Sequence, residues 1–389
     1  MAKITGILAG LSLILSAGKT PRKLKDLPRE SVYLLLLIII LFASALVSPV
    51  SRADAFFNTL DFAKVYVVWI LTYMLVTTLR RLRRIVFIQN ASVAVVSFAA
   101  IIKGHSVPRL SGVIGGFYSN PNDLAFGVVL ALPFCLAFLF TTKSTFRKMV
   151  WCCAILVMAI ALFMTASRAG FIDLLISGAY CLYFFGIKGK RHSLLIATIV
   201  LGALILAVAG GPLFSRFASI STGEGSAYGS YVERQILMAR AIEAIVYHPL
   251  LGVGAQNFIS YSGLWRNVHV SYLQIGAEAG IPGLILYLMF FYRGFVNLRR
   301  LASEQVDREM EVFVGASRAS LIGFVVGACF APEAYQFFPY FAVCYTSVLL
   351  AMVGERKRAP APVTARVVRS RFGELSMNPG GSRASYAAW

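Results

Sequence analysis

Charged side chains are scarce in this sequence. They make up 14% of its 389 residues, whereas a soluble domain carries about 25%. Hydrophobic residues reach 58%, and the mean hydropathy is +0.74. The shortage of charge excludes an ordinary soluble domain and indicates a polytopic membrane protein.

Familiar catalytic and metal motifs are also absent. The six cysteines all fall inside apolar runs and form no CxxC pair, so we infer neither a disulfide framework nor a metal site. The sequence contains no DxD, HExxH, P-loop, GxGxxG or GxSxG motif. An enzyme built from it would work without a metal or another cofactor. Its cations would be arginines, whose natural partner is a phosphate or diphosphate.

Long apolar runs fill most of the chain, and a run of about 20 apolar residues crosses a bilayer as a helix. Ten runs occur, at 32–49, 62–79, 85–102, 122–141, 150–166, 169–187, 194–214, 269–292, 316–331 and 336–353. A shorter run covers 4–17. None alternates with polar residues, which favours helices over a β-barrel. We therefore predict an all-α, polytopic transmembrane helical bundle of about 10–11 spans over residues 1–354.

Basic residues outnumber acidic ones by 37 to 17, which gives a net charge of +20. In a soluble chain this charge would suggest nucleic acid. Here most of it lies in six segments: 19–31, 80–84, 143–148, 188–191, 293–318 and the tail after 354. Because positive segments stay cytoplasmic, the alternate connections face outward: 50–61, 103–121, 167–168, 214–268 and 332–335. The charge thus indicates topology and contact with membrane lipids, and no nucleic acid.

The two ends of the chain differ from its middle. After residue 354 the composition turns to Arg, Pro, Ala, Ser and Gly, which does not support a packed core. We predict that 355–389 is a disordered, basic cytoplasmic tail. At the other end, the run over 4–17 lacks a signal-peptide cleavage site, so we expect it to be retained.

The longest outward connection, 214–268, begins with a Gly/Ser-rich stretch that predicts a flexible loop. Ser230 and Glu233 then form a capping box, and Pro249 stops a helix near His248. We predict a short amphipathic helix between them, about 18 residues long.

Arg234 lies on the apolar side of that predicted helix, in line with Met238, Ala241 and Ile245. An arginine among apolar side chains must meet an anion or extend to water. Two interpretations stay open: contact with an anionic ligand, or a purely structural arginine.

A helix start lies in the outward connection before 122–141. Asn120 is its expected cap, Pro121 its first residue, and Asp123 falls in its first turn. The N-terminus of a helix attracts anions, and Arg109 lies nearby in sequence. The alternative is an ordinary capped helix that binds nothing.

Arg168 stands between two apolar runs on the outward side, where positive charge is disfavoured, and we interpret it as functional. Asp173 lies inside the following run. A carboxylate within the membrane is a candidate for function, but we favour a structural pair between Asp173 and an arginine.

His269 is one of only four histidines and stands at the outer end of the run RNVHVSYLQIGAEAGIPGLILYL. On a helix it would share one line with Tyr272, Gly276 and Gly280, whose glycines allow another helix to approach closely. An imidazole there can exchange protons near neutral pH. Without a functional partner, His269 would merely cap the helix. Glu278, on the other side and deeper, is expected to serve structure.

Four stretches together resemble the O-antigen ligase and polymerase superfamily of bacterial membrane glycosyltransferases. They are RLSGVIGGFYSNPNDLAFG, SRAGF, RQILMARAIEAIVYHPLLGVGAQNF and VHVSYLQIGAEAGIPGLILYL, in that order between about residues 105 and 290. The HPLLGVG turn combined with the VH–YLQ–E–GIPG run is specific to the family.

The resemblance implies a helical bundle with one large periplasmic loop, 214–268. It implies a bacterial inner-membrane enzyme whose site faces the periplasm and which takes glycans from undecaprenyl diphosphate. His269 would activate or position the acceptor hydroxyl. Arg168 and Arg234, and by a weaker match Arg109, would hold the diphosphate.

Supporting roles in that site are expected for three further residues: Asn120, Asn122 and Tyr272. Two departures from the family stand out. Its members often have twelve spans, one or two more than this chain, and Met238 replaces a frequent tryptophan.

Several activities fit this pattern. We expect a ligase that transfers the glycan to lipid A–core by direct displacement, with inversion at the sugar. The alternative is an O-antigen or exopolysaccharide polymerase that joins lipid-linked repeat units, with another glycan as acceptor. A protein O-oligosaccharyltransferase and a transporter or flippase are less favoured. Transporters hold substrate near the middle of the membrane, whereas the polar candidates here lie at the outer side.

Overall fold

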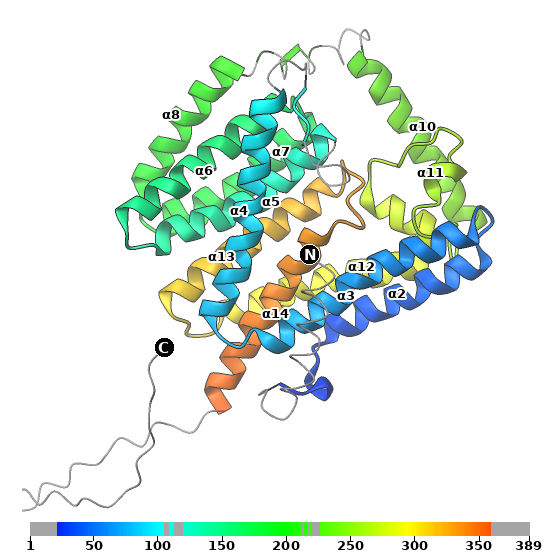
Figure 1. The fold of residues 1–389 in the computed structure, drawn as a ribbon, viewed down its shortest axis with the longest axis horizontal. Helices are drawn as coiled ribbons and strands as arrows, with labels where there is room; N and C mark the ends of the chain where they lie inside the picture. Colours follow the sequence, from blue (N-terminus) through cyan, green and yellow to red (C-terminus); the bar gives the residue numbers. More distant parts are fainter. Residues whose placement is uncertain are drawn as a thin grey trace, which may run out of the picture.

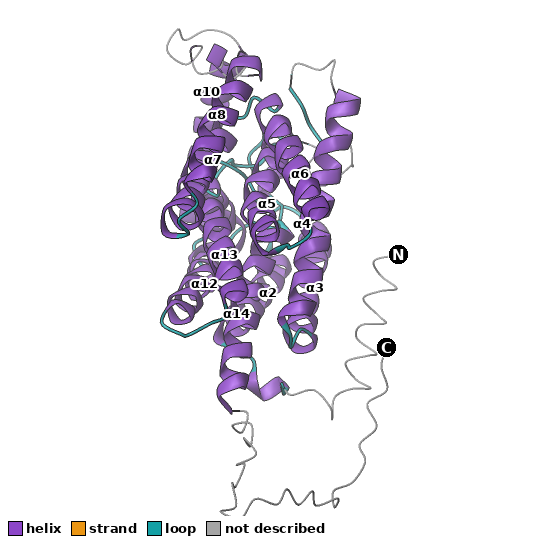
Figure 2. Ribbon diagram, turned by 90° about the vertical axis from the view of Figure 1, so that its left-hand side faces the viewer, coloured by secondary structure: helices purple, strands orange, loops and turns teal. Residues whose placement is uncertain are grey.

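The computed structural model describes residues 22–104, 109–112, 120–209, 211, 214–215, 218 and 226–358. Over these residues the chain is helical and contains no strand. Long helices pack side by side in a bundle (Figures 1 and 2). The prediction of an all-α, polytopic bundle is confirmed.

Nine helical stretches of the described residues are long and apolar enough to cross a membrane: α2 (Arg29–Val47), α3 (Arg52–Leu75), α4 (Leu79–Gly104), α5 (Pro121–Thr141), α6 (Thr145–Met164), α7 with η2 (Arg168–Cys181 and Leu182–Lys188), α12 (Ser271–Ala302), α13 (Arg308–Gly327) and α14 (Phe337–Arg358). The predicted span 194–214 corresponds to a further apolar helix, α8 (His192–Ala209). The predicted run 4–17 lies outside the described residues.

The core of the bundle is built from α5, α13 and α14, each about three-quarters buried along its apolar stretch. Aromatic rings fill it: the centroids of Phe291 and Phe324 are 4.3 Å apart, and Tyr287 and Tyr340 are fully buried. By contrast, less than a third of α6 is buried. The outer helices therefore expose apolar surface, which is the surface a membrane covers.

The helix α12 is kinked. Gly280 has φ 69° and ψ −178°, a backbone conformation that interrupts the helix and favours glycine. Pro282 follows and has no N–H to donate. The predicted line of side chains from His269 to Gly280 is therefore wrong as a continuous stripe. His269 also precedes the helix, which begins at Ser271.

The turn that follows α10 (Ser226–Tyr247) supplies hydrogen-bond partners for the backbone groups around this kink. Three backbone hydrogen bonds join turn and kink: Val253 N–H to Ala277 O (2.9 Å), Gly254 N–H to Glu278 O (3.0 Å) and Ile281 N–H to Pro249 O (2.8 Å). Buried backbone groups need such partners. The HPLLGVG and GIPG sequences therefore form one structural unit, which fixes α10 against the first half of α12.

Only a glycine fits at the closest point of that unit. Gly252 has φ 69°, and a side chain there would clash with the backbone of Glu278. Gly276 lies against Ile245 of α10, so the expected close approach of another helix does occur on this side of α12.

Two local predictions are wrong. Asp173 is buried, but no arginine pairs with it in the part of the chain described. Its carboxylate packs against Gly327, where the missing side chain leaves room. In addition, α14 continues to Arg358 instead of giving way to a tail at 355. Ion pairs of Arg356 with Asp307 and of Lys357 with Glu304 hold its last turn. Residues 359–389 lie outside the described residues.

Candidate functional site

A cavity of about 130 Å³ lies where the start of α5, the first half of α10 and the segment before α12 meet. Its walls are formed by Arg109, Asn120, Asn122, Ser230, Glu233, Arg234, Leu237, Arg266 and His269. Five of the seven residues proposed from sequence are thus brought together: Arg109, Asn120, Asn122, Arg234 and His269. They come from three stretches far apart in the chain.

The start of α5 shapes one wall. Asn120 caps the helix by accepting a hydrogen bond from the N–H of Asn122 (2.9 Å), with Pro121 as the first residue, as the sequence predicts. The Asn122 side-chain oxygen accepts from the Arg109 guanidinium (3.2 Å) and from the Ser167 hydroxyl (2.8 Å). Asn122 therefore orients an arginine at the cavity.

A second bond fixes Arg109. Its Nε donates to the carbonyl oxygen of Thr165 (3.0 Å), and the N–H of Leu110 donates to Met164 (3.0 Å). The short segment 109–112 is therefore tied to the corner between α6 and α7. With its position held at two points, the Arg109 guanidinium has little freedom left to lose on binding an anion.

Arg168 and Tyr272 stand apart from the cavity. Arg168 is the first residue of α7, next to Ser167, which caps that helix and bonds to Asn122. It is therefore adjacent to the site without lining it. The Tyr272 hydroxyl donates to the carbonyl oxygen of Val325 on α13 (2.8 Å), which holds two helices together.

Arg234 extends from the packed side of α10. It is half-buried and lines the cavity beside Leu237, which is fully buried like Ala241 one turn further on. The predicted apolar line through Met238 is wrong at that residue, because Met238 is exposed. The predicted capping box is wrong too. The helix begins at Ser226, so Ser230 lies inside it.

The charge of the cavity is positive. Arg109, Arg234 and Arg266 line it, and Glu233 is the acidic residue in its wall. Glu233 accepts from Arg266 (2.9 Å), an exposed ion pair at the rim. Deeper in the cavity, Arg234 and Arg109 supply the positive charge that an anion would meet.

His269 is held as a neutral imidazole. Its Nδ1 lies 3.1 Å from the carbonyl oxygen of Asn267, so Nδ1–H donates and Nε2 keeps a free lone pair. Burial and then the charge of Arg234, with a smaller contribution from Arg266, lower the pKa of His269 to about 4, although the hydrogen bond to Asn267 acts in the opposite direction. At neutral pH the imidazole can accept a proton.

Sequence reasoning missed Glu333, and it placed Asp123, which Glu333 faces, only in the first turn of a helix. Glu333 is buried in the connection before α14, and its N–H donates to the hydroxyl of Ser271 (2.9 Å), two residues after His269. Burial, and then the neighbouring carboxylate of Asp123, raise the pKa of Glu333 well above its usual value. The available signal was an acidic residue in the predicted outward connection 332–335.

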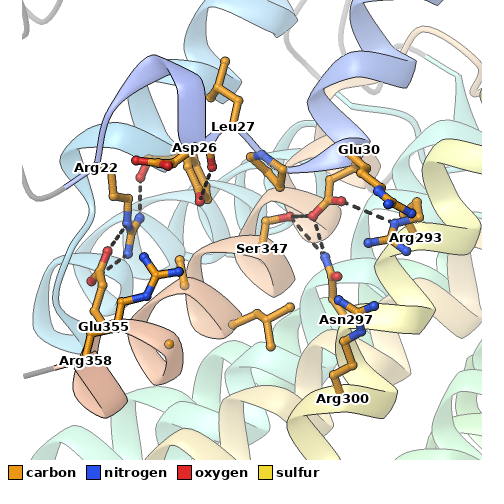
Figure 3. A pocket seen from close by; sticks show the side chains of 16 residues that line it. Arg22, Asp26, Leu27, Glu30, Arg293, Asn297, Arg300, Ser347, Glu355 and Arg358 are labelled. Atoms are coloured by element: carbon orange, nitrogen blue, oxygen red, sulfur yellow. Dashed lines mark hydrogen bonds and ion pairs between the residues drawn. The ribbon is translucent and has the colours of Figure 1, made fainter.

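A larger cavity, of about 550 Å³, lies at the far end of α12 (Figure 3). Glu30 is buried there and accepts from Asn297 (2.6 Å) and Ser347 (2.5 Å), and Arg22 pairs with Glu355 (2.6 Å). Asn297 lies 17 residues beyond the kink at Gly280, roughly 25 Å along the second half of α12. The larger cavity shares no lining residue with the cavity at His269, so the two are separate.

The fold and the cavity define a multi-pass membrane protein with a positively charged cavity beside an imidazole at one end of its bundle. The model of the O-antigen ligase family matches residues 153–288, which include Arg168, Arg234 and His269. The match confirms the predicted relationship to the O-antigen ligase and polymerase superfamily. The family implies a membrane enzyme of the glycosyltransferase type with lipid-linked glycan substrates.

Two further comparisons add little. One similar solved structure is a chain described under "Structural coordination of polymerization and crosslinking by a peptidoglycan synthase complex". It is 15% identical, with 84% of this chain and 97% of that chain covered and a TM-score of 0.42. No curated protein matches the chain.

Proposed function

We propose that this protein is an O-antigen ligase-type glycosyltransferase. It would move a glycan from undecaprenyl diphosphate to an acceptor hydroxyl of lipid A–core, at the periplasmic face of the bacterial inner membrane. The observation that carries the proposal is a neutral imidazole, His269, in one cavity with Arg109 and Arg234. This set can accept a proton and hold a diphosphate at the same place.

In this proposal the acceptor hydroxyl gives its proton to Nε2 of His269 while its oxygen attacks the anomeric carbon of the donor sugar. The new carbon–oxygen bond forms as the bond from the sugar to the diphosphate breaks, and the electron pair leaves with the diphosphate. A positioned base of this kind contributes about 10²–10⁴-fold. A single displacement inverts the anomeric centre, so NMR of the product linkage should show inversion. Retention would contradict the step.

The arginines would stabilise the departing diphosphate. Arg234 and Arg109 line the cavity, and Arg168 starts α7 beside it. Charge that develops on a leaving group is stabilised best by donors already in position. A bound diphosphate would also cancel the repulsion that Arg234 exerts on a protonated His269. The base would then be stronger with donor bound than without.

The orientation follows from charge. The basic segments around Arg83, Lys188 and Arg356 lie at the end of the bundle away from the His269 cavity, where ion pairs join them to the connection before α13 and to the start of that helix. Positive segments stay cytoplasmic. The cavity would therefore face the periplasm, and the end of α14 the cytoplasm.

A polymerase is the alternative, because the family includes both activities and the same cavity would serve a lipid-linked acceptor. A transporter is less favoured, since the polar groups gather at one end of the bundle and not at its middle. The acceptor separates ligase from polymerase.

The test is His269→Ala in the native host, with lipid-linked and surface glycans analysed together. His248→Ala is the matched control: His248 stacks edge-on against Tyr261 in the same segment and lies outside the cavity. Long glycans stranded on the lipid carrier, with bare core at the surface, support the ligase. Stranded single repeat units support the polymerase. Unchanged glycans, with variant present in the membrane, refute both.

A further inference from the structure

A groove of about 1030 Å³ runs along the outside of the bundle between α4 and α6, two neighbouring helices near the right-hand side of Figure 2. Only about a third of the apolar stretch of either helix is buried. The groove is therefore open to the side from which membrane lipid approaches.

One end of the groove is strongly basic. Arg80, Arg84 and Arg147 line it, and none of them has an ion-pair partner among the described residues. Arg83 pairs with Glu309 and lies over the ring of Phe138. Three positive charges at this end of the groove thus have no ion-pair partner among the described residues, and they repel one another unless an anion binds.

The rest of the groove is apolar. Exposed side chains of α4 and α6 form its walls: Phe87, Ile88, Val95, Phe146 and Val150. From Arg80 to Val95 the groove follows 15 residues of α4, about 22 Å of helix. One leaflet contributes about 15 Å of hydrocarbon plus its headgroup, so the groove spans one lipid.

Helix direction places the charge where a headgroup would be. Both α4 and α6 begin at the basic end, so their positive helix ends add to the arginines. An anion bound there would meet guanidinium groups on two helices at once. The apolar walls offer no hydrogen bonds to an inorganic phosphate, but they can pack against acyl chains.

We propose that this groove is a binding site for one anionic glycerophospholipid of the membrane. The phosphate lies among Arg80, Arg84 and Arg147, and the acyl chains lie along Phe87–Val95 of α4. Basic pockets between membrane helices recognise anionic headgroups in this way. The site is independent of the glycan chemistry at the other end of the bundle.

The test is native mass spectrometry of the full-length protein released from nanodiscs of phosphatidylcholine that contain a minor share of phosphatidylglycerol. One phosphatidylglycerol per chain should be retained. The triple variant R80Q/R84Q/R147Q should bind it about 100-fold more weakly, because each basic residue contributes about fivefold. The matched control K23Q/K25Q/R299Q removes the same charge from exposed residues outside the groove and should retain the lipid.

A second variant tests the apolar part without changing charge. Ala91 lies in the groove wall and is half-buried, so Ala91→Phe should fill the space and displace the lipid. Inorganic phosphate should not compete, whereas a soluble anion site would be emptied by it. Equal retention of phosphatidylcholine and phosphatidylglycerol, or equal loss in the triple variant and its control, would overturn the proposal.

Discussion

The small cavity around His269 and the larger groove between α4 and α6 both contain arginines, but different groups surround those arginines. In the cavity of about 130 Å³ the neighbours are amides and a neutral imidazole. In the groove of about 1030 Å³ they are phenylalanine, isoleucine and valine. In both proposals the arginines bind an anion. The neighbouring groups distinguish a proposed anion that reacts from one that only binds.

The two regions also differ in how firmly their arginines are held. Arg109 is fixed by hydrogen bonds to Thr165 and Asn122, whereas Arg80 and Arg84 are exposed at the start of α4. A guanidinium held in place offers a defined set of donors. An exposed guanidinium offers mainly its charge. Catalysis requires a guanidinium that is held in place, whereas binding of an anionic lipid requires mainly the positive charge.

Replacing an arginine by lysine in the His269 cavity and in the groove should give the largest difference between the two regions. Arg234→Lys keeps the charge but loses the forked donors, so glycan transfer should fall about 100-fold, as when one transition-state donor is removed. Arg84→Lys should change lipid retention less than about twofold, because charge is what matters there. Glycan transfer assays and native mass spectrometry measure the two. Near-normal transfer by Arg234→Lys would argue against a diphosphate clamp.

The position of Arg234 relative to His269 depends on the turn at Gly252. Gly252→Ala should cost about 2–4 kcal/mol, because it adds a clash with the α12 backbone to an unfavourable φ. Gly263→Ala is the control: φ is +72° there too, but no atom lies near the added carbon, so about 1 kcal/mol is expected. Thermal unfolding in nanodiscs compares them. Equal losses would mean that the contact with α12 contributes nothing.

The pH dependence tests the electrostatics of the cavity. Because the pKa of His269 is lowered to about 4, the free enzyme should keep its neutral base from pH 7 down to near pH 5, and kcat/KM should decline only below that. Burial and Arg234 disfavour imidazolium. The folded protein should therefore lose stability as the pH falls from the usual histidine value of about 6.5 toward 4.

The acid limb of kcat should lie at higher pH than that of kcat/KM, since bound diphosphate favours the protonated imidazole. Arg234→Gln should raise the pKa of free His269 by removing a cation. NMR of labelled histidine can follow this, as the chain has four histidines. A native pKa near 6.5, unmoved by Arg234→Gln, would remove the electrostatic link between the two residues.

The smallest effect is expected at the rim of the cavity. The ion pair of Arg266 with Glu233 is exposed, and such pairs contribute about 0–1 kcal/mol. Glu233→Gln should therefore change stability by less than about 1 kcal/mol and leave most transfer activity. Thermal unfolding and a transfer assay check both. A loss as large as that of Arg234→Lys would place Glu233 in the reaction itself.

Arg234 and His269 could be singled out in the sequence because they break local rules, and the resemblance to the O-antigen ligase and polymerase superfamily supplied their expected roles. Arg234 falls on the packed side of a helix, and His269 stands at the end of an apolar run. Residues that follow those local rules could not be recognised as part of the site from the sequence. Glu333 looked like an ordinary loop residue until the fold buried it against Asp123, and Ser230 looked like a helix cap although α10 starts four residues earlier.

The helices and their membrane character were determined by the sequence itself, because a run of apolar residues must satisfy its backbone internally wherever it meets lipid. The concentration of basic residues at one end of the bundle was also determined by the local sequence. Tertiary structure alone decided that α10 is joined to the Gly280 kink of α12, and that Arg109, Asn122, Arg234 and His269 surround one cavity. Those contacts join segments up to 160 residues apart, and no local pattern specifies partners at such separations. They form only when packing of the whole bundle determines which helix ends meet.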